Sequence, residues 1–189
     1  MLVAKAIGEK TEFKPNYIFF MDTNDNLLQL DKLFFEADQD IKDGLIAEAF
    51  DKLVYIIEQE TEYGKAYNHL GWIYETKYKN YAKAEECYRL SLKYAPGYSA
   101  VYLNYAILLS TLERFDELKS HLEGALEVRG VNKSKIWNEF GIMNELQGKY
   151  QEAIDAYKKG IQYSLVNDDI ERYKKSIDRC KHKVEINEM

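Results

Sequence analysis

The chain of 189 residues is long enough to bury one full hydrophobic core, a length typical of one or two domains. Hydrophobic residues make up 46% of it and charged residues 31%, which is the composition of an ordered chain. The net charge is −6 and basic residues alternate with acidic ones, whereas nucleic-acid-binding proteins concentrate Lys and Arg on one face. We therefore expect no nucleic-acid partner. Since no apolar run approaches a membrane span of about 20 residues, we expect no membrane partner either.

The N-terminal sequence MLVAKAIGEK lacks the charged leader and the apolar core of a secretory signal peptide. The two cysteines, Cys87 and Cys180, are far apart in the sequence, and a reducing compartment is favoured over a disulfide between them. These features predict a cytoplasmic location, unless a leader has been removed from the chain.

Residues 1–26 fit no repeat, and we expect them to form an N-terminal extension with an extended backbone. Their run from Tyr17 to Met21 is too apolar to remain in water, and Pro15 disfavours a helix at the residue before it. Three places could bury this run: the side of the first of the helical units described below, the groove that those units are expected to form, or the same groove in a second copy of the chain. The third case would make the segment a dimerisation arm.

Between residues 27 and 167, a pattern of large and small residues recurs at steps of about 34 residues. Tyr67, Leu70, Gly71 and Tyr74 are spaced i, i+3, i+4 and i+7, so they share one face of a helix. The corresponding positions elsewhere are Tyr102, Tyr105, Ala106 and Leu109, then Trp137, Phe140, Gly141 and Asn144, and, more faintly, Leu33, Glu36, Ala37 and Asp40.

A second pattern follows each copy of the first. Ala84 and Tyr88 have counterparts in the other copies, which are Ala49 and Leu53, Leu118 and Leu122, and Ala153 and Tyr157. Short turn signals separate the two patterns, at 42–44, 77–80, 112–115 and 147–150. We therefore predict four units, each with two amphipathic helices of roughly 14 residues joined by a tight turn. The units span about 30–63, 64–98, 99–133 and 134–167.

Residues 168–189 are predicted to form a C-terminal capping helix. Its apolar stripe contains Ile170, Tyr173 and Ile177 and ends at Cys180 or Lys181. Asp168 or Asn167 is expected to cap its N-terminus. The outer face is heavily charged, as the last unit of a repeat array requires.

These repeats resemble the tetratricopeptide repeat family over roughly residues 30–167. The family pattern W-x2-L-G-x2-Y, then A-x3-F, then P, is met well by the second and fourth units. The third unit departs from it at Ala106 and Gly130, and the first unit at most positions of its first helix. The resemblance implies an all-α fold, a right-handed α-solenoid of about four helix-turn-helix units plus a C-terminal capping helix. It also implies that Gly71 and its equivalents let two helix backbones approach closely.

No motif in the sequence indicates catalysis, so we predict a non-enzymatic protein without a cofactor or a metal. The three histidines lie in three different elements, and neither a phosphate-binding loop nor a nucleophile motif is present. Cys180 and His182 are too few for a zinc site, which takes four ligands. His69 is expected to be a half-buried histidine that bonds a neighbour.

The resemblance places function in a concave groove lined by the first helix of each unit. The residues expected there are Phe34, Asp38, Lys65, Asn68, Trp72, Glu75, Leu103, Ile107, Asn138, Ile142 and Glu145. The apolar members form a strip, which Asn68 and Asn138 flank with side-chain amides able to bond a peptide backbone. The alternative is that these residues only pack helix on helix. Family members that clamp a C-terminal carboxylate need Lys and Asn where Phe34 and Asp38 stand, so that ligand is not expected.

The sequence thus predicts a protein–protein interaction scaffold that binds a peptide or protein segment in this groove. Two alternatives remain open, which are a small acidic chaperone for secreted substrates and an accessory subunit of an enzyme complex.

Overall fold

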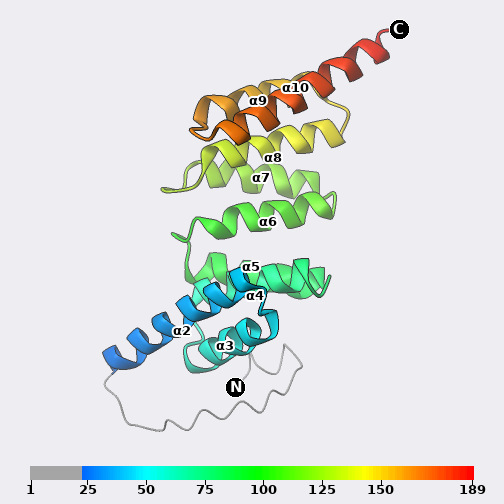
Figure 1. The fold of residues 1–189 in the computed structure, drawn as a ribbon. Coiled ribbons are helices and arrows are strands. Elements are labelled where there is room, and N and C mark those ends of the chain that lie inside the picture. Colours follow the sequence, from blue (N-terminus) through cyan, green and yellow to red (C-terminus); the bar gives the residue numbers. More distant parts are fainter. Residues whose placement is uncertain (1–22) are drawn as a thin grey trace. The chain divides into compact units, whose positions relative to one another are not determined.

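The computed structural model describes residues 23–189, with side chains from residue 26 onward. This part of the chain contains nine helices and no strand (Figure 1), which confirms the expected all-α fold. The apolar run from Tyr17 to Met21, and most of the expected N-terminal extension, lie outside the described residues. The first described helix begins at Thr23, so the boundary expected after residue 26 falls inside that helix.

The described chain forms two compact units, which divide between Tyr98 and Ser99. In the first unit each helix packs against the next one in the chain. Its helices are α2 (Thr23–Asp43), α3 (Ile46–Gln59), α4 (Gly64–Thr76) and α5 (Tyr81–Tyr94). The core of this unit follows the helical period. In α3, for example, the buried residues Ala49, Leu53 and Ile56 recur at steps of four and three residues, and so share one face.

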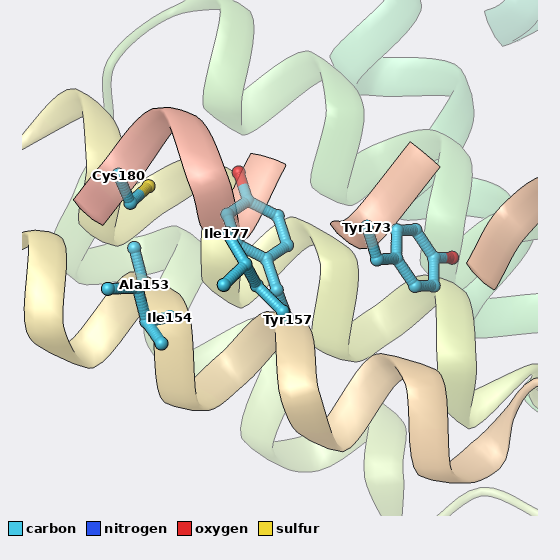
Figure 2. Packing of buried hydrophobic residues seen from close by; sticks show 6 residues of the cluster. All are labelled: Ala153, Ile154, Tyr157, Tyr173, Ile177 and Cys180. Carbon is cyan, nitrogen blue, oxygen red and sulfur yellow. The ribbon is translucent and has the colours of Figure 1, made fainter. Parts of the chain in front are cut away.

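The second unit contains five helices, and again consecutive helices pack against each other. They are α6 (Ala100–Thr111), α7 (Phe115–Leu126), α8 (Lys133–Leu146), α9 (Tyr150–Tyr163) and α10 (Asn167–Asn187). Figure 2 shows the cluster that fixes α10 on α9, in which the first three residues belong to α9 and the rest to α10: Ala153, Ile154, Tyr157, Tyr173, Ile177 and Cys180.

The last helix follows the predicted stripe but not the predicted cap. Tyr173, Ile177 and Cys180 are buried, whereas Lys181 is exposed. Neither Asp168 nor Asn167 caps α10, because Val166 occupies the capping position with an extended backbone and offers no side-chain hydrogen bond. Asp168 instead lies in the first turn, where a carboxylate interacts favourably with the helix dipole.

The turns inside the four helix pairs share one backbone conformation. The residues with positive φ are Gly44 (80°), Lys79 (54°), Glu113 (55°) and Gly148 (73°), spaced by 34 or 35 residues. In each turn, the N–H of the following residue donates to a carbonyl five or six residues earlier, for example Asn80 to Tyr74 at 2.9 Å and Lys149 to Asn144 at 2.8 Å. This is the left-handed helix ending that glycine usually provides.

The small residue in the first helix of a pair accommodates a ring from the second helix. A Cβ atom added to Gly71 would lie 2.6 Å from Cε1 of Tyr88, and one added to Gly141 would overlap the ring of Tyr157. The expectation of two closely approaching backbones at Gly71 is therefore wrong, because the aromatic ring fills that space. Backbones do approach at Gly64, where an added Cβ would lie 2.7 Å from the backbone nitrogen of Ala95.

The same two positions carry a different pair in the other two repeats. Where the first helix has Ala37 or Ala106, the second helix has Leu53 or Leu122, and all four side chains are fully buried. A larger residue in the first helix thus accompanies a smaller one in the second.

Candidate protein-binding surface

In the first unit, the residues expected on the binding surface lie on α2 and α4, and His69 joins the two helices. Its ring lies edge-on to Phe34, with centroids 4.7 Å apart, and its Nε2 lies 3.1 Å from the Asp38 carboxylate. Nδ1 of the same ring lies 3.2 Å from the carbonyl oxygen of Lys65. His69 is therefore a half-buried residue that bonds its neighbours, as predicted.

Asp38 is held in its charged form by its partners. Lys42 donates a hydrogen bond to Asp38 at 2.7 Å, and this bond, supported by His69, lowers the pKa of the carboxyl group despite its partial burial. The carboxylate thus remains ionised at neutral pH, on the same side of α2 as the half-buried ring of Phe34.

The four expected residues of α4 fall into two groups. Lys65 is exposed and Trp72 is half-buried, with the ammonium group of Lys77 5.2 Å from the centre of the Trp72 ring. Asn68 and Glu75 are only 3% and 7% exposed. Tyr88 donates a 2.6 Å hydrogen bond to Glu75; burial raises the pKa of this carboxyl group, and the bond from Tyr88 opposes the rise. Asn68 and Glu75 therefore offer little surface to a ligand.

In the second unit, the expected residues of α6 retain accessible surface. Leu103 is half-buried and Ile107 is 40% exposed, although its neighbours Ala106 and Leu108 are fully buried. On α8, the side chain of Asn138 donates a hydrogen bond to Glu139 at 3.2 Å, and Ile142 packs beside the cluster of α9 and α10. The apolar members of the expected surface are thus partly exposed in both units.

Glu145 of α8 belongs to an ionic network with α9 and α10. Arg179 donates one hydrogen bond to each carboxylate oxygen of Glu145, both at 2.7 Å, and Lys183 adds a third at 2.8 Å. Tyr157 donates a fourth at 3.0 Å. The bonds from Arg179, more than any other partner, lower the pKa of Glu145 to about 2. We did not predict these partners from the sequence, although the i, i+4 spacing shows that Arg179 and Lys183 lie on one side of a helix.

Two kinds of site are not found in the described part of the chain. Over residues 23–189, no group of three or more His, Cys, Asp or Glu side chains could hold a metal ion. No helix in the same range is both long and apolar enough to span a membrane.

Comparison with known proteins identifies one repeat of the chain and proteins that share its fold. A sequence model of the tetratricopeptide repeat matches residues 64–98, the second of the four predicted units. No curated protein matches the chain. Among solved structures, TTC0263, a thermophilic tetratricopeptide repeat protein of Thermus thermophilus, superposes with a TM-score of 0.63 at 18% identity, over 82% of this chain and 84% of that one.

Two further structures share the fold. The MamA protein superposes with a TM-score of 0.66 at 14% identity, over 84% of each chain. PilW, a type IV pilus biogenesis factor, superposes with a TM-score of 0.65 at 15% identity, over 84% of this chain and 77% of PilW. Together with the repeated helix pairs, these similarities define an all-helical repeat protein that shares the fold of tetratricopeptide repeat proteins, and residues 64–98 match the tetratricopeptide repeat itself.

Proposed function

We propose that the protein is a non-enzymatic scaffold that binds a peptide or protein segment through the first helices of its repeats. The observation that supports this most is the exposure pattern of five apolar side chains at two helix positions that recur from repeat to repeat. None of the five belongs to the buried core, although each lies on a helix that is otherwise well packed: Phe34, Trp72, Leu103, Ile107 and Ile142.

Partly exposed apolar side chains that recur at the same two positions of successive repeats are typical of interaction sites, since exposed apolar patches on monomeric proteins are small unless they bind a partner. Aromatic residues such as Trp72 contribute strongly to binding at protein interfaces. The polar residues around them differ in availability. The carboxylate of Asp38 is already bonded by Lys42 and His69, whereas Lys65 is exposed. A segment with apolar side chains and at least one negative charge is therefore the ligand that fits the first unit best.

Affinity capture from the native cell extract, followed by mass spectrometry, tests this proposal. We expect Trp72→Ala and Ile107→Ala to lower partner recovery at least about tenfold, the loss expected from a hot-spot side chain worth more than about 1.4 kcal/mol. Leu165→Ala is the matched control, because Leu165 is a fully exposed apolar residue in the turn before α10.

Circular dichroism must show unchanged helix content in all three variants. Equal recovery with wild type, Trp72→Ala and Ile107→Ala would place the binding surface elsewhere. Recovery of a secreted protein would favour a chaperone, and recovery of an enzyme would favour an accessory subunit, the two other functions that the sequence allows.

A further inference from the structure

The first described helix, α2, has one apolar side that no other described helix covers. On α2, Leu28 is 69% exposed, Phe35 is 67% exposed, and Leu27 beside them is 49% exposed. Leu28 and Phe35 are seven residues apart, which is two helical turns, so their side chains lie on the same side of the helix. That side is opposite Ala37, which is fully buried. We call these three residues the outer face of α2.

The repeat shows what such a face normally contacts. Phe35 precedes the small residue of its helix by two positions, as His69 and Glu139 do in α4 and α8. In α4, His69 contacts the preceding first helix through Phe34 and Asp38, and its side chain is only 12% exposed. Glu139 of α8 is 7% exposed. The outer face of α2 is therefore the side on which a preceding repeat would stack, and residues 23–189 contain no such repeat.

We propose that the segment from Phe13 to Met21 docks on the outer face of α2 and closes this end of the repeat array. The segment leads into α2, which begins at Thr23, and contains five consecutive apolar residues from Tyr17 to Met21. Phe35 lies about 18 Å along the helix from Thr23, at 1.5 Å per residue. Nine extended residues span up to about 30 Å, so a segment that folds back along α2 reaches the whole outer face. In that register Tyr17 lies beside Phe35.

A tethered segment fits this face better than a second copy does. Three side chains bury at most about 250 Å² each. They cannot supply the roughly 800 Å² per partner that a stable interface between chains requires. A segment joined to α2 does not need that area, because the tether gives it an effective concentration in the millimolar range. Docking would also leave a less apolar surface at this end, as α10 does with charged side chains at the other end.

Disulfide trapping in the full-length chain tests the docking. We expect the variant with Tyr17→Cys and Phe35→Cys to form a link within one chain at least about tenfold faster than the control with Tyr17→Cys and Leu165→Cys. Leu165 is fully exposed, and the natural thiols Cys87 and Cys180 are buried. Equal rates for both pairs would overturn the proposal. A link between two chains would also overturn it and assign the face to a second copy.

Thermal unfolding of a double-variant cycle provides an independent readout. Tyr17→Ser and Phe35→Ser should each lower the Tm by about 2–5 °C, since each exposes one side of the same contact. The double variant should lose no more than the larger single loss, because the contact is already absent. Additive losses, or no loss from Tyr17→Ser, would contradict the docking. Leu165→Ser combined with Tyr17→Ser is the control pair and should show additive effects.

Discussion

A single methyl group at Gly71 should destabilise the fold, although alanine is the better helix former. The Cβ of Gly71→Ala would lie 2.6 Å from Tyr88 Cε1 and 2.7 Å from Cδ1, whereas carbon atoms in contact are about 3.5–4.0 Å apart. The ring must therefore move by about 1 Å. It has little room to do so, because Tyr88 is fully buried and its hydroxyl donates a 2.6 Å hydrogen bond to Glu75.

The expected change in stability combines one stabilising contribution with two destabilising ones. Replacing an interior helical glycine with alanine stabilises a helix by about 1 kcal/mol. Forcing an extra carbon into a packed core costs about 1–3 kcal/mol, and loss of the Tyr88–Glu75 hydrogen bond adds about 1–3 kcal/mol. We expect a net loss of about 1–5 kcal/mol, which corresponds to a fall in Tm of roughly 3–15 °C for a chain of this size. Gly71→Leu should be more damaging.

Urea and thermal unfolding, followed by far-ultraviolet circular dichroism, measure this loss. Gly124→Ala is the matched control, since Gly124 lies in α7 and an added Cβ there meets no atom within 4 Å. This control should gain up to about 1 kcal/mol from helix propensity alone. The reasoning is refuted if Gly71→Ala melts at or above the wild-type temperature. Tyr88→Leu in the Gly71→Ala background should recover part of the loss, because leucine removes the ring that the methyl group contacts.

Two further predictions concern the turns and the ionic network. Lys79→Gly and Glu113→Gly should each raise the free energy of unfolding by about 1 kcal/mol in urea denaturation, because both residues have positive φ, where glycine is less strained. A lower free energy of unfolding in both variants would contradict the assigned turn conformation. The pKa of Glu145 is lowered from 4.5 to about 2, so its contribution to stability should be complete above pH 4.5 and disappear as the pH falls toward 2. Acid unfolding of Arg179→Ala should therefore begin at higher pH than that of wild type, and an unchanged acid midpoint would show that the Arg179–Glu145 bonds do not stabilise the fold.

The helix pairs could be read from the sequence because the chain repeats its pattern. Each copy constrains the others, so the position of Gly71 in the interface of its pair followed from four aligned stretches. The group that approaches it did not, because the spacing of residues along a helix does not give the direction of a side chain from the partner helix. The sequence led us to expect the backbone of the partner helix beside Gly71, and the ring of Tyr88 lies there instead.

The candidate surface could be predicted only in part from the sequence, for a related reason. Helix position predicts which side a residue faces, and the five apolar residues do retain exposed area. It does not predict what covers that side. Glu145 faces Arg179 and Lys183, which lie 34 and 38 residues later in the chain and belong to a helix outside the repeat pattern. Glu75 is buried and accepts a hydrogen bond from Tyr88, and this pairing depends on how α4 and α5 pack, which the sequence pattern does not give.

The alternation of the two interface pairs limits how these repeats can change during evolution. A repeat with Gly71 and Tyr88 cannot become one with Ala106 and Leu122 by a neutral first step. If alanine comes first, the methyl group meets a ring that is still present; if leucine comes first, the lost ring leaves a cavity above the glycine. The two positions must therefore change almost together, or with a compensating change nearby. Each of these repeats therefore has one of two packing types, and conversion from one to the other requires two coupled substitutions rather than a change in conformation.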